Sequence, residues 1–390
     1  MSSRTLRQHA IPFFAPALGD EEIDSVVETL RSGWLTTGPK VRRFEEAFAT
    51  AVSARHAVAV SSCTAALHLA LEAVGIGSGD EVLIPSLTFA STGEVVMHLG
   101  ATPVLVDCGD QFLIDVQELE RKITSRTKAV IPVHYGGHPC EMDKILEIAT
   151  KHDLRVIEDA AHALPAMYRD RAVGSIGDLT CFSFYANKTI TTGEGGMVTT
   201  DDDELAERVR LMSLHGISKD AWKRFSAEGS WYYEITAPGY KSNMTDIAAA
   251  IGIHQLNRSD GFWERRNEIA GEYNRGFAQT PEIITPKSEA HVQNAWHLYV
   301  IRLDTERLSI SRNDFISALN ESGIGTSVHY LPLHMHPLYR DRFGYEPGDL
   351  PRAARLFEQI ISLPIHPKLS EQDVARVIET AVRLVEENRQ

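Results

Sequence analysis

The chain has 390 residues, of which 43% are hydrophobic and 24% charged, the composition of a globular protein with more than one domain. The net charge of −14 argues against a nucleic-acid partner, because nucleic-acid-binding proteins present a basic face. No apolar stretch reaches the roughly 20 residues that a membrane-spanning helix needs, and the first residues carry no secretory signal, so we expect a cytoplasmic protein without a membrane partner. Cys63, Cys108, Cys140 and Cys181 are widely spaced, which indicates reduced thiols and not a disulfide framework or a metal site.

Short apolar runs alternate with helical patterns in the first half of the chain. Strands are predicted at residues 56–60, 81–84, 102–106, 128–133 and 154–157, and helices at 64–74 and 142–152. This alternation predicts an α/β fold with a mostly parallel sheet flanked by helices. Ligands in such folds bind at the carboxyl ends of the strands.

The pattern changes beyond residue 250. A charged amphipathic helix is predicted at residues 262–278, followed by a strand at 296–302 and a helix at 312–321. Apolar residues at a spacing of three and four, from Val374 to Val385, predict a C-terminal helix. We therefore predict a large domain at residues 1–255, with an N-terminal segment, and a smaller α+β domain at 256–390.

Two residues near predicted strand ends are candidate catalytic residues. Asp159 follows the apolar run 154–157, and Lys188 follows the run 179–182 and precedes a glycine-rich turn at 191–197. Pyridoxal phosphate chemistry uses a lysine to form a Schiff base and an acid to keep the pyridine nitrogen protonated. Glu158 lies beside Asp159, and alternation along a strand lets only one of the two face the site, but the pattern does not decide which.

Further residues could hold the same cofactor. Small residues at 61–66 lead from a strand into a helix, whose free backbone N–H groups and positive dipole end suit a phosphate, although Ser and Thr there are also ordinary helix caps. Ser183 lies five residues before Lys188 and could donate its hydroxyl to the phosphate. Phe89 could stack on the pyridine ring or belong to the core.

Taken together, these motifs resemble the DegT/DnrJ/EryC1/StrS family of pyridoxal-phosphate sugar aminotransferases, which have the type I fold of such enzymes. The resemblance covers nearly the whole chain. The segments that carry it are 32–39, 61–67, 79–82, 85–89, 131–137, 158–162, 182–197, 238–246 and 327–330.

The resemblance implies a role for each matching residue. Lys188 would form the Schiff base and Asp159 would pair with the pyridine nitrogen. The residues expected at the cofactor phosphate are Thr64, Ala65 and Ser183.

The resemblance also implies contacts around the ring and the substrate. His162 would lie near the ring, and Phe89 would stack over it. Asn243 would reach the phosphate of a neighbouring subunit, which implies a homodimer with shared active sites. His329 and Tyr330 are the expected substrate residues.

The implied reaction moves an amino group from L-glutamate, through pyridoxamine phosphate, to the C4 keto group of a nucleotide-linked sugar. Histidine at position 162 resembles the enzymes that act at C4. The expected acceptor is a UDP-linked 4-keto-6-deoxyhexose or 4-keto-pentose, for surface polysaccharide, lipopolysaccharide or natural-product biosynthesis. A C3 aminotransferase acting on a dTDP-linked 3-keto sugar, a non-catalytic cofactor-binding regulator and a sugar dehydratase are the alternatives.

Two further polar segments lie in the second half of the chain. His329, His334 and His336 are close together in the sequence, but they have no neighbouring cysteine or acid to complete a metal site. The basic loop from Leu214 to Arg224 could contact a nucleotide diphosphate or remain solvated.

Overall fold

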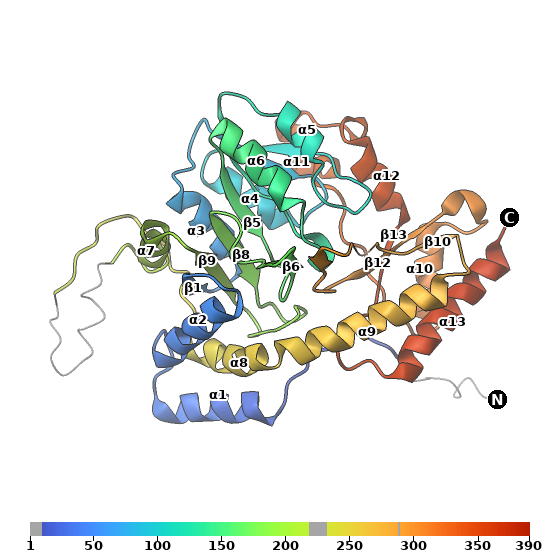
Figure 1. The fold of residues 1–390 in the computed structure, drawn as a ribbon, viewed down its shortest axis with the longest axis horizontal. Coiled ribbons are helices and arrows are strands. Elements are labelled where there is room, and N and C mark those ends of the chain that lie inside the picture. Colours follow the sequence, from blue (N-terminus) through green and yellow to red (C-terminus); the bar gives the residue numbers. More distant parts are fainter. Residues whose placement is uncertain (1–9, 218–231, 288) are drawn as a thin grey trace.

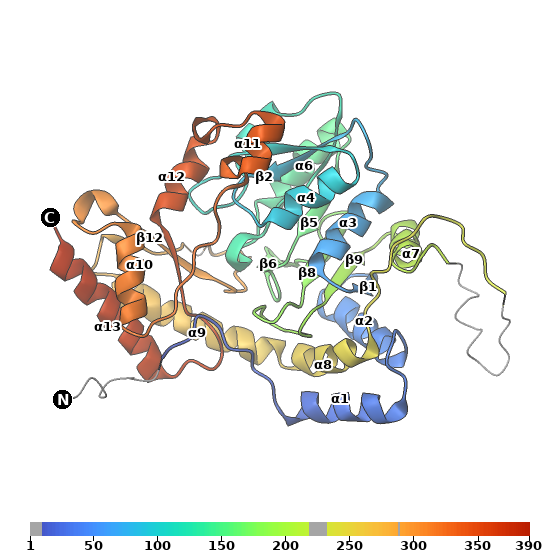
Figure 2. The same ribbon diagram turned by 180° about the vertical axis from the view of Figure 1, so that it is seen from behind.

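The computed structural model describes residues 10–217, 232–287 and 289–390. A seven-stranded sheet lies between two layers of helices, and a smaller group of strands and helices lies beside it (Figures 1 and 2). The long helix α9 (Ser259–Phe277) runs from the helices below the large sheet to this smaller group. The C-terminal helix α13 (Glu371–Asn388) packs against α9 there.

The strand order of the large sheet is β1-β9-β8-β5-β4-β2-β3. β9 pairs antiparallel with β1 and β8, and the other neighbouring strands are parallel, which confirms the predicted mostly parallel sheet. Its strands are β1 (His56–Val60), β2 (Glu81–Pro85), β3 (Thr102–Val106), β4 (Thr127–Val130), β5 (Arg155–Asp159), β8 (Leu179–Ser183) and β9 (Gly196–Thr200).

Alternate side chains of these strands enter two separate cores, because successive residues of a strand point to opposite faces. Ala57 and Ala59 of β1 belong to one core, and Val58 and Val60 belong to the other. The helices of the large unit are α1 (Asp20–Ser32), α2 (Pro39–Ala51), α3 (Cys63–Ala73), α4 (Ala90–His98), α5 (Val116–Arg121), α6 (Met142–His152), α7 (Asp203–Met212) and α8 (Asp246–Asn257). Residues of α2, α5, α6 and α8 fill the first core, and residues of α3, α4 and α7 fill the second.

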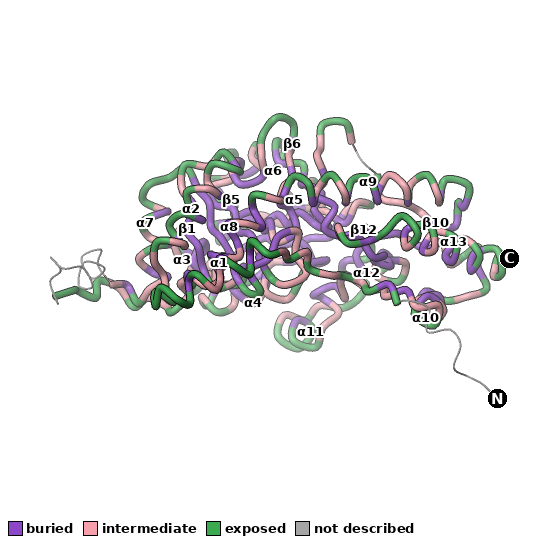
Figure 3. Tube along the Cα trace, turned by 90° about the horizontal axis from the view of Figure 1, so that it is seen from below, coloured by how far each residue is buried: buried purple, intermediate pink, exposed green. Residues whose placement is uncertain are grey.

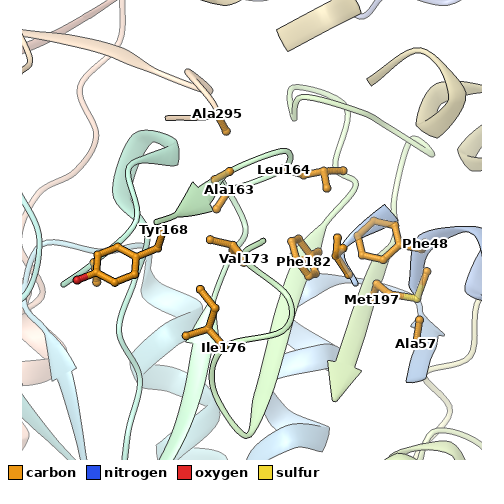
Figure 4. Packing of buried hydrophobic residues seen from close by; sticks show 14 of the residues in the cluster. Phe48, Ala57, Ala163, Leu164, Tyr168, Val173, Ile176, Phe182, Met197 and Ala295 are labelled. Carbon is orange, nitrogen blue, oxygen red and sulfur yellow. The ribbon is translucent and has the colours of Figure 1, made fainter. Parts of the chain in front are cut away.

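Aromatic rings dominate one end of the first core. The Phe48 ring lies 4.9 Å from the Phe182 ring, edge to face, and both side chains are buried (Figure 4). Figure 3 shows that buried residues follow the strands through the middle of the molecule, while the outer sides of the helices are exposed. The strands of the large sheet are therefore embedded in buried side chains.

The smaller group is built on an antiparallel sheet in the order β10-β12-β13. Its strands are β10 (Ile283–Ile284), β12 (Tyr299–Leu303) and β13 (Ile360–Leu363), and its other helices are α10 (Arg312–Glu321) and α12 (Pro351–Gln359). Helix α11 (Pro337–Phe343) instead packs on the large unit, where Tyr339 belongs to the second core (Figure 2). A third sheet, of β6 (Met167–Tyr168), β7 (Arg171–Ala172) and β11 (Val292–Gln293), joins the two parts of the chain. The predicted boundary at residue 255 falls in the last turn of α8, and the division into two domains stays a prediction.

Candidate active site

Lys188 and Asp159 line one cavity of about 410 Å³ at the carboxyl ends of β5 and β8. Asp159 is the last residue of β5, and Lys188 lies five residues beyond β8, in the connection to β9. The other predicted site residues that line this cavity are Thr64, Phe89, His162, Ser183, His329 and Tyr330. The structure thus brings together residues that are spread over much of the chain.

Asp159 is buried, and its carboxylate has defined partners. Oδ1 accepts a hydrogen bond from the Ala161 N–H at 3.1 Å, and Oδ2 accepts one from the Thr92 hydroxyl at 2.9 Å. Burial raises the pKa of Asp159 above its ordinary 3.8, although these hydrogen bonds and the charge of Lys188 act in the opposite direction. A protonated ring nitrogen beside this carboxylate would relieve the cost of its burial.

Glu158 belongs to a different environment, so the structure decides between the two neighbouring acids. Its carboxylate accepts hydrogen bonds from the Gly177 N–H and the Thr180 hydroxyl, both at 2.8 Å, and its Oε2 lies 2.9 Å from His134 Nε2. Because Glu158 and Asp159 point to opposite sides of β5, only Asp159 reaches the cavity.

The Lys188 amine is desolvated. Burial lowers the pKa of Lys188 from 10.5 to about 8, although the neighbouring Cys63 and Asp159 act in the opposite direction. A lysine with this pKa has a substantial neutral fraction near neutral pH, and the neutral amine is the nucleophile that attacks a carbonyl.

The start of α3 faces the same cavity. Ser62, Cys63 and Thr64 line it, and Ser183 contributes a hydroxyl from the end of β8. The first residue of β9 must approach this helix start closely, because a Cβ at Gly196 would lie 2.5 Å from the Ser62 carbonyl carbon. Hydroxyl groups at the positive end of an 11-residue helix have the chemistry that suits a phosphate.

The side chains of His162 and Tyr330, which are hydrogen-bonded to each other, form another wall of the cavity. His162 Nδ1 accepts a hydrogen bond from the Gly136 N–H at 3.2 Å, so the proton of the neutral ring lies on Nε2, 3.2 Å from the Tyr330 hydroxyl. Burial, with the charges of Lys188 and His329, holds the pKa of His162 well below 6.5 and keeps this ring neutral. The exposed Phe89 ring lies 5.7 Å from the Tyr330 ring at the cavity wall.

His329 is fixed from outside the cavity. Its Nδ1 lies 2.8 Å from the Ser362 hydroxyl, and the Tyr135 hydroxyl donates a hydrogen bond to its backbone carbonyl. Burial, with the charge of Lys188, lowers the pKa of His329 to about 4. His329 and Tyr330 are thus held as neutral, polar groups beside Lys188.

Two predicted residues lie outside this cavity. The Ala65 N–H donates a hydrogen bond to the Ser62 hydroxyl at 3.1 Å, as in an ordinary helix cap. Asn243 lines a separate cavity of about 390 Å³, and its Nδ2 donates to the Thr37 hydroxyl at 2.6 Å. Of the basic loop, Lys219, Lys223 and Arg224 lie outside the described residues.

Sequence reasoning missed three residues of the site. Thr92 binds Asp159 directly, and the hydroxyls of Thr88 and Thr92 lie 2.8 Å apart. The His297 ring lies 4.4 Å from the His162 ring. Thr92 is 67 residues from Asp159 in the sequence, and no local pattern reports such a contact.

The histidines of residues 329–336 have separate partners. His334 Nδ1 lies 2.7 Å from the Ser86 hydroxyl, and His336 Nε2 lies 3.2 Å from the Leu331 carbonyl. Within residues 10–217, 232–287 and 289–390, no group of three or more His, Cys, Asp or Glu side chains is placed to hold a metal ion.

The residues around Lys188 fit pyridoxal phosphate. An amine for its aldehyde, a carboxylate for its ring nitrogen, a hydroxyl-lined helix start for its phosphate and an aromatic side chain line one cavity. The cavity also offers a buried acceptor without a partner in the described part of the chain, Asn187 Oδ1.

Comparisons with known proteins agree with this geometry. Over residues 16–382 the chain matches the DegT/DnrJ/EryC1/StrS aminotransferase family. The chain is 54% identical to the spore coat polysaccharide biosynthesis protein SpsC of Bacillus subtilis over 379 residues, which are 97% of each protein.

Solved structures show the same fold. Spr1654 from Streptococcus pneumoniae, a proposed sugar aminotransferase, matches in its PMP form with a TM-score of 0.91 and 38% identity over 97% of this chain and 98% of Spr1654. Helicobacter pylori PseC, an aminotransferase involved in the biosynthesis of pseudoaminic acid, matches with a TM-score of 0.91 and 29% identity over 97% of this chain and 100% of PseC. The predicted type I fold is confirmed, and the chain belongs to the DegT/DnrJ/EryC1/StrS aminotransferase family.

Proposed function

We propose that this sugar aminotransferase uses pyridoxal phosphate to move an amino group from L-glutamate to the C4 keto group of a nucleotide-linked sugar. The cofactor prediction is confirmed by membership of this family and by the PLP and PMP forms of Spr1654. The observation that carries the proposal is the shared cavity of Lys188 and Asp159, a desolvated amine beside a buried carboxylate.

The bound cofactor supplies an electron sink for the carbon that carries the amino group. Asp159 would hold a proton on the ring nitrogen, and Thr92 would keep its carboxylate oriented. Thr64, Ser183 and the start of α3 would bind the phosphate, with Ala65 contributing from the first turn of the helix. Phe89 would cover the ring from the exposed side.

Lys188 would carry the proton between the substrate carbon that bears the amino group and the cofactor carbon joined to the same nitrogen. With its pKa at about 8, the amine could accept the proton from one of these two carbons and donate it to the other, in opposite directions in the two half-reactions. Its location in the connection between β8 and β9, anchored by its backbone N–H to the Tyr185 carbonyl at 3.0 Å, keeps it beside Asp159 after its release from the cofactor.

Tyr330 and His329 would orient the keto sugar. Because His162 donates its Nε2 proton toward the Tyr330 oxygen, the hydroxyl proton of Tyr330 is left to donate into the cavity. Burial and the charge of Asp159 raise the pKa of Tyr330, so it stays protonated as a hydrogen-bond donor to a sugar oxygen.

The small number of cationic side chains in the cavity supports a homodimer in which a second subunit contributes to each active site. Among the described residues, Lys188 is the single lysine or arginine that lines it. A cofactor phosphate and a nucleotide diphosphate bring several negative charges, which cations normally balance. We propose that Asn243 of a second subunit completes the site together with Lys241, whose ammonium group donates a hydrogen bond to Asn243 Oδ1.

The relatives support a carbohydrate substrate. SpsC is named for polysaccharide biosynthesis and PseC for the biosynthesis of pseudoaminic acid, which favours an amino-sugar product destined for a surface carbohydrate. None of the helices in the described ranges has the length and apolar character needed to cross a bilayer. All four cysteines are buried and unpaired, which favours a reducing compartment, the cytoplasm.

The test is a product assay with purified enzyme, pyridoxal phosphate, L-glutamate and a panel of UDP- and dTDP-linked 4-keto and 3-keto sugars. NMR of the product is expected to show a new amine at C4 of a UDP-linked sugar. An amine at C3 of a dTDP-linked sugar would overturn the regiochemistry, and no amino sugar from any donor would overturn the function. Mixing Lys188→Ala and Asn243→Ala subunits is expected to restore part of the activity if sites are shared.

A further inference from the structure

A second cavity, of about 150 Å³, lies between the large sheet unit and the smaller sheet. It shares no lining residue with the cavity of Lys188. Its walls come from the loop before Phe112, the 3₁₀ turn η1 (Tyr135–Gly137), the segment after β10 and strand β12. A cavity of this volume holds one six-membered ring.

Arg302 of β12 supplies a cation to this cavity. Its side chain is only 19% exposed, and its ion pair, from Nη1 to the exposed Asp110 carboxylate, is long at 3.8 Å. Within the described ranges its guanidinium group makes no hydrogen bond, although the group has five N–H donors. A guanidinium group at a cavity wall, with one long ion pair and no hydrogen bond to the described residues, has donors available for an anion that enters the cavity.

Asn294 adds a second polar group. Asn294 is buried, and its Oδ1 accepts a hydrogen bond from the Trp296 N–H at 2.8 Å. Its Nδ2 makes no hydrogen bond to the described residues and can donate to a ligand. Lys287 brings another positive charge to the rim, where it is exposed. Asp110 is the acid that lines the cavity, so the local charge favours an anion.

Aromatic side chains in strained backbone positions form the walls. Phe112 and Trp296 have φ values of 69° and 51°, a region that bulky residues avoid, and both are buried against the cavity. The Tyr135 ring lies 5.0 Å from the Phe112 ring. Residues with strained backbone angles are often found at functional sites, where the fold holds their side chains in one position. Here the side chains surround a cavity with room for one ring.

The turn η1, which lines this cavity, and the residue before it also hydrogen-bond residues of the Lys188 site. The His134 N–H donates to the Asp159 carbonyl at 3.1 Å, the Tyr135 hydroxyl donates to the His329 carbonyl, and the Gly136 N–H donates to His162 Nδ1. Three consecutive residues therefore each bind a different residue of the Lys188 site. A ligand that contacts Tyr135 and Gly136 would act on all three contacts.

We propose that this cavity is an effector site for a planar, single-ring anion, whose ring lies among Phe112, Tyr135 and Trp296 and whose charge binds Arg302. Occupancy changes the position of η1 and thereby the rate of the Lys188 site. The ligand chemistry has two sources, a pyrimidine carboxylate and a benzene carboxylate. Orotate and 4-hydroxybenzoate are the probes that distinguish them.

The test is calorimetric titration of the enzyme loaded with pyridoxal phosphate. At least one probe is expected to bind, and Arg302→Gln is expected to weaken binding about tenfold or more, because it removes charged hydrogen bonds. Asn294→Asp keeps the acceptor for the Trp296 N–H but adds a negative charge, so it weakens binding as well. Arg307→Gln, which changes an exposed arginine five residues away, is the matched control and keeps wild-type affinity.

The second readout is the rate at which L-glutamate bleaches the visible band of the bound cofactor. A saturating probe is expected to change this rate in the wild type and in Arg307→Gln, and not in Arg302→Gln. Failure of both probes to bind, or equal affinity in Arg302→Gln and the wild type, overturns the site. Binding that depends on Arg302 but leaves the bleaching rate unchanged overturns the effector role. Binding is measured without turnover, so this result is separate from the proposed reaction.

Discussion

The lowered pKa of Lys188 predicts how fast the protein captures its cofactor at each pH. Capture requires the neutral amine, whose fraction is set by the pKa of Lys188, about 8 instead of 10.5. The difference of 2.5 pKa units gives roughly 300-fold more neutral amine at pH 7 than an ordinary lysine has. The capture rate should therefore rise with pH, with an inflection near pH 8.

The assay is stopped-flow absorbance of the visible band after pyridoxal phosphate is mixed with cofactor-free protein from pH 6 to 10. Asp159→Asn removes a negative charge that raises the pKa of Lys188, so its inflection should lie at lower pH. Lys188→Ala should show no such band. A rate that still rises without an inflection up to pH 10, or an inflection that Asp159→Asn leaves in place, would refute a desolvated lysine beside Asp159.

Three further predictions concern the support of the site. Thr92→Val removes the 2.9 Å hydrogen bond to Asp159, and the Kd for pyridoxal phosphate, measured by equilibrium dialysis, should rise about tenfold or more; an unchanged Kd would contradict this role. Phe48→Ala should lower the free energy of urea unfolding by about 3–5 kcal/mol, because its ring is fully buried; a loss below about 1 kcal/mol would show that the core repacks. Burial of Glu158 raises its pKa, but hydrogen bonds from His134, Gly177 and Thr180 outweigh burial and hold this pKa below 4.5. The ionised carboxylate therefore stabilises the folded protein fully above pH 4.5, and this stabilisation is lost as the pH falls through the lowered pKa. Glu158→Gln should therefore lower the free energy of urea unfolding by about 3 kcal/mol at pH 7 and by progressively less as the solution is made acidic. A loss at acidic pH equal to the loss at pH 7 would count against an ionised Glu158 carboxylate.

The strand ends could be predicted because the relevant signals are local. Apolar runs bounded by turn residues predicted β1 and β3 with their observed bounds, and the periodicity at 142–152 predicted α6. Since parallel strands present their carboxyl ends at one edge, Asp159 and the residues after β8 had to lie close together. Lys188, Ser183 and the pair Glu158 and Asp159 were found in this way.

Contacts between distant segments could not be predicted from the same signals. Thr92 reads as an ordinary residue of α4, and only the packing of α4 near the end of β5 brings its hydroxyl to Asp159. The choice between Glu158 and Asp159 required the partners on each side of β5. Arg302 likewise lies within a strand whose apolar pattern gives no sign of a guanidinium group facing a cavity.

The measurement that tests the central claim most directly is the visible spectrum of the purified protein with pyridoxal phosphate during titration with L-glutamate and then with a nucleotide-linked keto sugar. The account predicts a band that requires Lys188, that L-glutamate bleaches and that one keto sugar restores. A protein without this band, or a Lys188→Ala variant that retains both the band and full transfer, would contradict the assignment of Lys188 on which the proposed function depends.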